Sequence, residues 1–438
     1  MSVIKIWQTI QPDFRQNWKS LLGKLSLDGV ILEQRDRLEI VRQIIARVRA
    51  EGDPAVSDLT ARHDKVTLTP EQFRIPPEQL QQAHEALEPS LLEAVRASIA
   101  NVRAYQKAIK VQPPADPDKD GVRLGLRQYP MGRVGVCIPG ASAPLVSTVI
   151  MTAVPALVAG VREIAVISSP SYEGSIHPAI LGVCHEIGIN EVYRISGAQG
   201  VAALGLGTQT IQRVDKIVGP SSWWGQMAKR ELYGLVDIDS VAGPSEVLIV
   251  ADTSARADWV AADMLSQAEH DPGSAILLTD STELADAVVD QIELQLNALS
   301  RAQGTRRCIE QFSAIIVTRD MSEAGDLCNE FAPEHLQVIT ADADAFSQRL
   351  VTAGAVFLGP HTPVAVGDYY AGPSHTLPTG TSARFFGPLS VNDFFKYSSV
   401  TRYDANALKQ AAGHIGTLAD AEGLDAHHKS VDIRLRWE

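Results

Sequence analysis

Uncharged apolar runs alternate with longer amphipathic stretches through the middle of the chain. Apolar runs such as Arg133–Ile138 and Glu163–Ser168 indicate strands that are buried on both faces of a sheet. The stretch between these two runs, 145–160, has the length and composition of a helix. The pattern predicts further strands and helices, with strands at 191–195, 214–218, 242–250, 274–279, Ala314–Val317 and 336–340, and helices at 176–187, 256–270 and 322–331.

Strands that alternate with helices form open, largely parallel sheets with helices on both faces. Two such series follow one another here. The sequence therefore predicts an α/β protein of two Rossmann-like open parallel-sheet lobes with a cleft between them. Ligands of such sheets bind at the carboxyl ends of the strands. The first series lacks the G-x-G-x-x-G fingerprint of a standard dinucleotide site after its first strand.

Short helical segments are expected at both ends of the chain. Trp7, Phe14 and Trp18 near the N-terminus suggest a helical arm that packs on another part of the molecule. Apolar residues at helical spacing predict further helices, and the tail is charged and helical in character. The expected division is a helical arm (1–29), a discontinuous first α/β domain (30–135 and 245–389), a second, Rossmann-like domain (136–244) and a C-terminal helical tail (390–438).

Charge and composition limit the partners and the cellular compartment that we expect for this protein. The net charge of −13 and the pI near 5.4 argue against nucleic acid or an anionic membrane as the main partner. The charge-free run 134–161 is long enough to span a bilayer, but Gly and Pro residues interrupt it, which favours a buried strand–helix–strand unit. The N-terminus lacks a signal-peptide pattern, and the four cysteines lack C-x-x-C spacing. We therefore expect a cytoplasmic protein.

Two adjacent ionisable side chains, Glu334 and His335, follow Pro333 where a predicted helix gives way to a predicted strand. A turn can aim neighbouring side chains at one cavity, whereas a regular strand points them to opposite faces. A carboxylate and an imidazole together can move two different protons near neutral pH. The pair is a candidate acid–base site, although a solvated turn would carry the same two residues.

Candidate metal ligands are scattered over the second half of the chain. Gln267 and His270 lie three residues apart on one face of a predicted helix, where an amide oxygen and an imidazole can bind a divalent ion. Asp368 stands beside a glycine turn, and His427 lies in the charged tail. Each is also compatible with an ordinary role, such as a histidine at its own helix terminus or an aspartate in a turn.

Seven short motifs strengthen the argument because they occur together in one order. They are Ala242-Gly-Pro-Ser-Glu246, Gln267-Ala-Glu-His270, Ala332-Pro-Glu-His-Leu336, Gly367-Asp-Tyr369, His375-Thr-Leu-Pro-Thr379, Ser390-Val-Asn-Asp-Phe394 and Ala421-Glu-Gly-Leu-Asp-Ala-His427. With these motifs the chain resembles the histidinol dehydrogenase family, zinc-dependent enzymes that complete histidine biosynthesis. The resemblance extends from about Arg35 to the C-terminus.

The resemblance implies roles for individual residues. Glu334 and His335 correspond to the family's acid–base pair. The ligands of one zinc ion per subunit would be Gln267, His270, Asp368 and His427. The substrate-binding residues would be Ser245, Gln267, His270, His335, Asp368, His375, Glu422 and His427. In the family, the residues equivalent to Glu422 and His427 come from the partner subunit of an intertwined homodimer, so we expect the C-terminal tail to be exchanged between subunits.

The resemblance also implies the reaction, a four-electron oxidation of L-histidinol to L-histidine through L-histidinal, with NAD as the oxidant. Zinc would hold the imidazole and amine of the substrate and fix the alcohol carbon for hydride transfer. His335, with an unperturbed pKa of about 6.5, would take the hydroxyl proton. Glu334 would activate the water that attacks the aldehyde.

Departures from the family pattern lie on the cofactor side. Cys137 stands where the family usually has a tyrosine, and Ser222 and Ser374 each replace an asparagine, whereas Gln199 is retained. Cys137, Gln199 and Ser222 are therefore the expected cofactor-binding residues, with an altered fit to NAD. Two other functions remain open: oxidation of a different small alcohol, such as a sulfopropanediol, and a non-enzymatic zinc-binding role.

Overall fold

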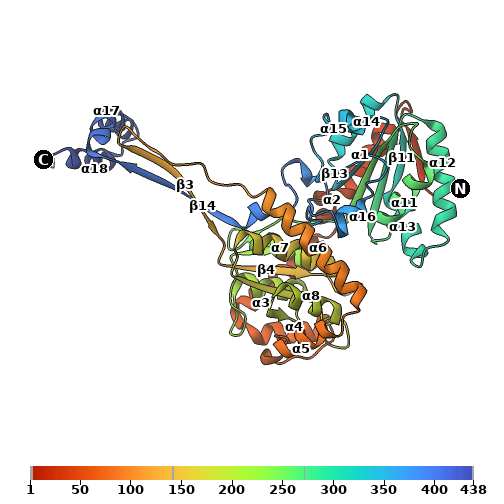
Figure 1. Ribbon diagram of the computed structural model, residues 1–438, viewed down its shortest axis with the longest axis horizontal. Coiled ribbons are helices and arrows are strands. Elements are labelled where there is room, and N and C mark those ends of the chain that lie inside the picture. Colours follow the sequence, from red (N-terminus) through yellow and green to blue (C-terminus); the bar gives the residue numbers. More distant parts are fainter. Residues whose placement is uncertain (1–2, 141–142, 271, 437–438) are drawn as a thin grey trace.

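Two α/β lobes and a long projecting arm make up the computed structural model of the chain (Figure 1). The structure describes residues 3–140, 143–270 and 272–436. Each lobe is built on a parallel sheet whose inner strands are buried, because helices cover both faces. The predicted α/β class, with two Rossmann-like lobes, is confirmed.

The first lobe holds a six-stranded parallel sheet. Its strands are β1 (Lys5–Gln8), β9 (Ser245–Ala251), β10 (Gly273–Thr279), β11 (Ala314–Val317), β12 (His335–Ile339) and β13 (Ala355–Leu358), in the spatial order β1-β11-β10-β9-β12-β13. Its helices are α1 (Phe14–Leu25), α11 (Ala257–Ala268), α12 (Thr282–Leu296), α13 (Ala302–Phe312), α14 (Met321–Phe331) and α15 (Ala343–Ser347). Val247 and Ile249 of β9 pack with α11, α12 and α13, while Leu248 and Val250 pack with α1 and α14, as the alternation of a strand requires.

The second lobe holds a five-stranded parallel sheet. Its strands are β4 (Arg133–Ile138), β5 (Glu163–Ser168), β6 (Glu191–Tyr193), β7 (Lys216–Val218) and β8 (Asp237–Ile238), in the order β6-β5-β4-β7-β8. Its helices are α7 (Val146–Ala159), α8 (Pro178–Ile187), α9 (Gly197–Leu206) and α10 (Trp223–Leu232). Numbered along the sheet, this order is 3-2-1-4-5, the arrangement of the doubly wound dinucleotide-binding fold.

The division into domains differs from the expected one. The helices α3 (Arg35–Glu51), α4 (Asp53–His63), α5 (Pro77–Glu85) and α6 (Pro89–Ala108) were expected in the first lobe, but they pack on the second. The apolar faces of α3 and α4 cover α9 and α10, and those of α5 and α6 cover α7 and α8. Residues 3–25 form no separate arm, because β1 pairs with β11 and α1 covers the first sheet. The short α2 (Leu27–Glu33) then leads the chain to the second lobe.

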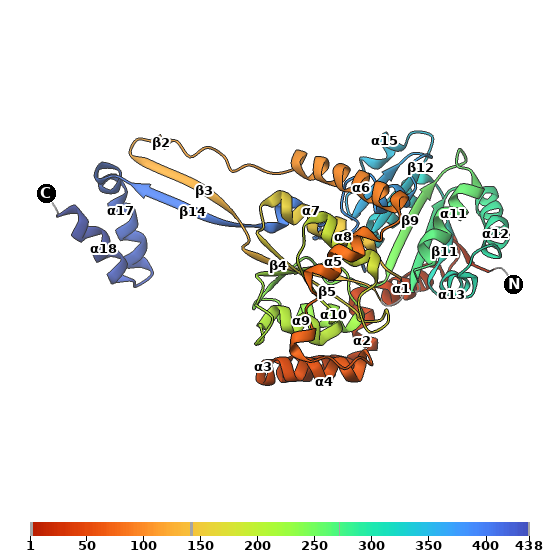
Figure 2. The same cartoon turned by 60° about the horizontal axis from the view of Figure 1, so that its bottom comes forward.

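The C-terminal tail is part strand, not wholly helical as expected. β14 (Phe395–Tyr403) pairs antiparallel with β3 (Val122–Pro130), which also pairs with β2 (Asp118–Lys119). Beyond this ribbon, α17 (Ala405–Ala421) and α18 (Asp425–Leu435) form the tip of an arm that points away from both lobes (Figures 1 and 2). Val122, Leu124 and Leu126 of β3 alternate with arginine or glycine, which is the pattern of a half-buried strand, yet all three are at least partly exposed in the single chain, as are most residues of β14.

Helix α7, inside the charge-free run, lies between the second sheet and the helices α6 and α8. No helix in the described part of the chain is long and apolar enough to cross a bilayer.

Trp18 provides a test of the N-terminal packing. Its indole is fully buried, and its ring centroid lies 6.3 Å from that of Phe14 and 5.9 Å from that of Phe331. Trp18→Ala should lower the free energy of unfolding by about 3–5 kcal/mol, the usual cost of deleting a buried aromatic side chain. Trp18→Phe should lose much less. Urea titrations of the three proteins measure this, and a loss of less than about 1 kcal/mol for the Ala variant would show that α1 is not part of the core.

Candidate active site

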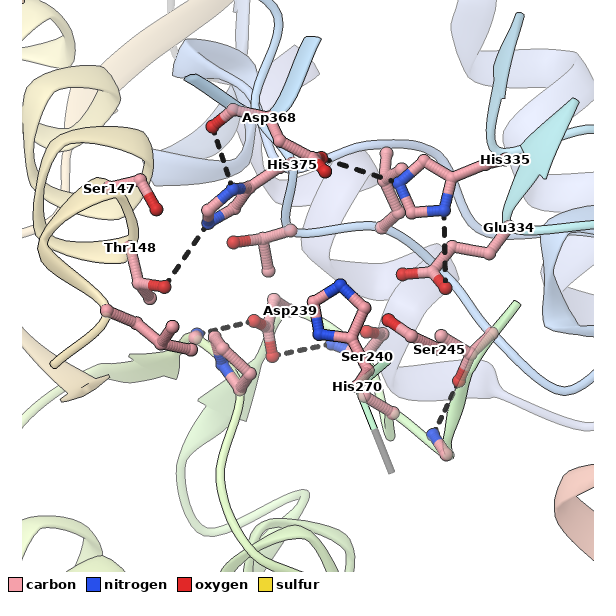
Figure 3. Close-up of a pocket in the computed structure, with 18 of the residues that line it drawn as sticks. Ser147, Thr148, Asp239, Ser240, Ser245, His270, Glu334, His335, Asp368 and His375 are labelled. Atoms are coloured by element: carbon pink, nitrogen blue, oxygen red, sulfur yellow. Dashed lines mark hydrogen bonds and ion pairs between the residues drawn. The ribbon is translucent and has the colours of Figure 1, made fainter. Parts of the chain in front are cut away.

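A cavity of about 210 Å³ lies between the two lobes (Figure 3). The first lobe lines it with six of the residues singled out in the sequence: Ser245, His270, Glu334, His335, Asp368 and His375. Four of these stand at or just before the amino ends of strands: Ser245 opens β9, His270 precedes β10, Glu334 precedes β12 and His335 opens β12. The first lobe thus departs from the rule that places ligands at carboxyl ends.

The second lobe faces this cavity with the opposite edge of its sheet. Gly219 and Pro220 follow β7, and Asp239 and Ser240 follow β8, so its contribution comes from carboxyl ends. Gly219 has φ +96°, and an added Cβ would come within 2.5 Å of the Cys137 carbonyl oxygen, so the turn requires glycine there. The amino edge of one sheet and the carboxyl edge of the other therefore enclose the site.

Glu334 and His335 both line the cavity, and both are buried, with exposures of 5% and 3%. The chain enters their turn through Ala332, which ends α14 in the left-handed conformation with φ 54°. His335 Nδ1 lies 3.0 Å from the carbonyl oxygen of Glu246 and donates to it. That bond leaves Nε2 as the basic nitrogen, 3.6 Å from Oδ1 of Asp368.

The charges around His335 shift its titration. Burial alone would lower the pKa of His335, but the nearby carboxylates of Glu334 and Asp368 outweigh it and raise the pKa to about 10. This differs from the unperturbed value expected from the sequence. For Asp368, burial would raise the pKa, but the adjacent imidazole of His335 lowers it. In the chain alone, the pair is an imidazolium beside a carboxylate.

His375 is held in one tautomer. Its Nδ1 lies 3.1 Å from the backbone carbonyl oxygen of Asp368 and donates to it, so its Nε2 accepts from the Thr148 hydroxyl at 3.3 Å. Burial lowers the pKa of His375. A neutral imidazole therefore ties α7 of the second lobe to the Asp368 segment, helix α16 (Val364–Tyr369).

Glu246 holds the Glu334–His335 turn, although the sequence analysis gave it no role. Its Oε1 accepts from the backbone N–H groups of Glu334 at 3.3 Å and Gly380 at 3.2 Å. Its own N–H donates to Oε2 of Glu334 at 2.8 Å, and its carbonyl oxygen accepts from His335. The one sequence signal was a glutamate directly before the apolar run Val247–Val250, where the strand is otherwise buried on both faces.

A second group missed by the sequence analysis is the buried ion pair between Lys229 and Asp239, both of which line the cavity. Lys229 also donates to the Gly219 carbonyl oxygen at 3.1 Å, and Asp239 accepts from the Gly219 N–H at 2.6 Å. The pair fixes the turn after β7 from both sides. Lys229 and Asp239 belong to none of the motifs of the resemblance, so no local pattern marked them.

The expected metal ligands are only partly brought together. His270 and Asp368 line the cavity. Gln267, one helical turn before His270, is 1% exposed, and its side-chain nitrogen has no hydrogen-bond partner among the described residues. Turning that amide would place its oxygen at the unpartnered position. An unpartnered amide, an imidazole and a carboxylate of lowered pKa fit an N/O-ligated divalent ion such as zinc.

Glu422 and His427 lie elsewhere. Both belong to the tip of the arm, and both are exposed. Figures 1 and 2 show that tip pointing away from both lobes of its own chain. Across residues 3–140, 143–270 and 272–436, no three His, Cys, Asp or Glu side chains form a metal-binding group. Of the four expected ligands, the cavity of one chain is therefore lined by two, His270 and Asp368.

The expected cofactor residues gather at a second cavity, of about 510 Å³, at the carboxyl ends of the second sheet. Cys137, Gln199 and Ser222 all line it. Burial raises the pKa of the Cys137 thiol to about 12, so this residue is a neutral, apolar wall. Ser374 does not line this cavity; its hydroxyl donates to the Met151 carbonyl oxygen at 2.9 Å in the interior. Its replacement of an asparagine therefore bears on packing beside His375.

The titration of Glu246 makes a prediction about stability. Burial and the charge of Glu334 raise the pKa of Glu246 from 4.5 to about 8. Between these pH values the folded chain keeps a proton that the unfolded chain releases, so this residue's contribution to stability falls as pH rises. Glu246→Gln keeps the acceptor oxygen and removes the proton uptake. In urea titrations, the free energy of unfolding of the variant should therefore rise relative to that of wild type as the pH increases from 4.5 to 8.

Glu78→Gln, an exposed change on α5, is the matched control and should follow the wild-type pH dependence. Equal pH dependence in wild type and the Glu246→Gln variant would show that Glu246 is ionised in the folded protein.

Comparison with known proteins shows the family of the chain. The family model described as histidinol dehydrogenase matches residues 31–435. Histidinol dehydrogenase of Rhodopirellula baltica is 44% identical over 428 residues, 95% of this chain and 93% of that protein. That of Moorella thermoacetica is 45% identical over 407 residues, 93% and 96% of the two chains. The crystal structure of histidinol dehydrogenase from Elizabethkingia anophelis matches with a TM-score of 0.91 at 32% identity, covering 100% of this chain and 99% of that one. The chain belongs to the histidinol dehydrogenase family.

Proposed function

We propose that this chain oxidises L-histidinol to L-histidine through L-histidinal, in a four-electron reaction that uses NAD and one zinc ion per subunit. Family membership supports the reaction class. The observation that carries the proposal is the cavity in which Glu334 and His335 lie together beside Asp368 and His270. Such a site supplies two proton-transfer groups next to a set of metal ligands.

His335 is the group that takes the hydroxyl proton of the alcohol. Its Nδ1–H is held by the Glu246 carbonyl oxygen, so the proton enters at Nε2, which lies on the Asp368 side. To act as a base, the imidazole must be neutral. The negative charge of Asp368 stabilises the His335 imidazolium, and a cation bound to Asp368 would offset that charge. Metal binding would therefore lower the pKa of His335 towards the range of a working base.

Glu334 is the group that activates water for the second oxidation. Its Oε2 accepts from the Glu246 N–H, so Oε1 is the oxygen that takes the water proton. The aldehyde must then lose hydride from the hydrated carbon to give the carboxylate. Two adjacent groups with separate proton tasks match two successive oxidations at one carbon.

Gln267, His270 and Asp368 would hold the zinc ion, with His427 of the partner subunit as the fourth ligand. Bound zinc supplies Lewis-acid attraction for the imidazole and amine nitrogens of the substrate. The chain's own part is to hold Gln267 on α11, His270 just after α11 and Asp368 on α16; His270 and Asp368 line the cavity. Ser245, His375 and Glu422 of the partner subunit complete the proposed substrate contacts.

NAD would bind in the second cavity, against Cys137, Gln199 and Ser222. The turn 219–222 connects the two cavities, because Gly219 and Pro220 line the first while Ser221 and Ser222 line the second. A nicotinamide ring that crosses this turn could accept hydride from an alcohol held beside His335. Cys137, Cys184 and Cys328 are buried free thiols, which supports a reducing compartment, and we propose the cytoplasm.

The deciding experiment counts NADH formed from L-histidinol by purified protein, both zinc-loaded and chelator-treated. The zinc-loaded protein should form two NADH per histidinol, because both oxidations occur in one site. Chelation should abolish turnover and added zinc should restore it. One NADH per substrate, or turnover of a different diol in place of histidinol, would contradict the proposed reaction.

Mixed dimers test the exchanged tail. His335→Asn damages the core of a site, and His427→Asn damages the tip of the arm. If each site combines one subunit's core with its partner's arm, an equal mixture of the two inactive variants should recover roughly a quarter of wild-type activity, since half of the dimers hold one intact site. If each arm serves its own core, the mixture should remain inactive. Mixing His335→Asn with itself is the control.

A further inference from the structure

The second cavity contains an acidic residue that the proposed function does not use. In doubly wound dinucleotide-binding folds, an acidic side chain near the end of the second strand accepts a hydrogen bond from the 2′-hydroxyl of the adenosine ribose. The second strand here is β5, and it runs into Ser168-Ser169-Pro170, with no carboxylate. The usual residue is therefore missing from its usual place.

Asp64 supplies a carboxylate to that place from outside the sheet. It follows α4, and it lines the cavity. Its Oδ1 accepts from the hydroxyls of Ser169 after β5, at 3.4 Å, and Ser196 after β6, at 3.1 Å. Its Oδ2 accepts from Nε2 of Gln199 at 3.0 Å. The carboxylate thus lies at the carboxyl ends of β5 and β6, beside an expected cofactor residue.

The groups around Asp64 do not fully offset the cost of burying its negative charge. Burial raises the pKa of Asp64 by more than its three hydrogen-bond donors and His63 lower it. A further donor from a ligand would stabilise the charged form. A carboxylate that served only to join the two loops would need no such donor.

The charges of this cavity would disfavour an added phosphate. Asp64 and His63 are the ionisable lining residues apart from the Cys137 thiol, and the described lining includes no lysine or arginine. The neighbouring Lys65 does not line the cavity; its ammonium donates to the Arg62 carbonyl oxygen at 2.7 Å. NADP sites normally provide an arginine for the 2′-phosphate.

We propose that Asp64 selects NAD over NADP, by accepting a hydrogen bond from the 2′-hydroxyl of the adenosine ribose and by repelling a 2′-phosphate. This inference rests on the proposed function in one respect, the use of a nicotinamide dinucleotide as oxidant. It adds the residue that recognises the ribose and the reason for the cofactor preference.

Three cofactors test the proposal: NAD, NADP and an NAD analogue that lacks the 2′-hydroxyl of the adenosine ribose. Zinc-loaded wild type, Asp64→Asn and the exposed control Glu78→Gln are compared by kcat/KM for each cofactor. Wild type and the control should lose about tenfold or more on the 2′-deoxy analogue, the usual worth of a hydrogen bond to a charged group. Asp64→Asn should lose little further on the analogue, and its NAD:NADP ratio should fall by about tenfold or more.

The proposal is overturned if Asp64→Asn keeps both the wild-type NAD:NADP ratio and the wild-type sensitivity to the missing hydroxyl. That outcome would leave Asp64 as a brace between two loops, with the histidinol reaction intact. If wild type turns over no histidinol at all, the proposed function fails instead. Trp224 lines the same cavity, so quenching of its fluorescence still measures binding of the three cofactors to each protein, and equal affinities in wild type and Asp64→Asn would then overturn the inference.

Discussion

The hydrogen bonds between Glu246 and the Glu334–His335 turn are the constraint on which the site depends. Parallel pairing of β9 with β12 sets His335 opposite Val247, which brings Glu246 level with Glu334 at the amino edge of the sheet. The main chain of Glu246 then fixes the side chains of both Glu334 and His335, and its carboxyl group binds the backbone of the turn. A buried carboxyl next to another carboxylate is costly unless it keeps its proton. The cost is incurred at the position where the carbonyl oxygen of Glu246 binds Nδ1–H and so fixes the tautomer of the neutral His335 imidazole.

The two lobes contribute in different ways because different edges of their sheets meet at the site. The second lobe offers carboxyl ends, where the loops after the strands form the proposed cofactor cavity, in keeping with the doubly wound fold. The first lobe offers amino ends, where side chains at strand starts are anchored by the sheet itself. Proton-transfer groups and metal ligands gain from such rigid placement. The Lys229–Asp239 pair of the second lobe fixes the turn at Gly219, and residues 219–222 of this turn line both cavities.

The sequence predicted those parts of the structure that local patterns determine. The strands Arg133–Ile138, Glu163–Ser168 and Ala314–Val317 have the predicted bounds, since buried parallel strands are continuous apolar runs. The assignment of α3 to α6 to the first lobe was wrong, because an amphipathic face shows that a helix packs but not on what. Glu246 and Asp64 act across 88 and more than 100 residues of sequence, and their partners became visible only in the fold. The Glu334–His335 pair could be singled out in the sequence because its members are neighbours.

The arm has exposed features that an isolated chain does not explain. A two-stranded ribbon is marginally stable by itself, and this one leaves Leu124, Tyr129 and Tyr397 substantially exposed. Its tip carries Glu422 and His427, which are exposed and belong to no metal-binding group among the described residues of their own chain. In the proposed dimer, the contacts that bury the exposed apolar side chains of the arm would also bring a metal ligand into the partner's cavity. Assembly and zinc binding would then be linked equilibria, each strengthening the other.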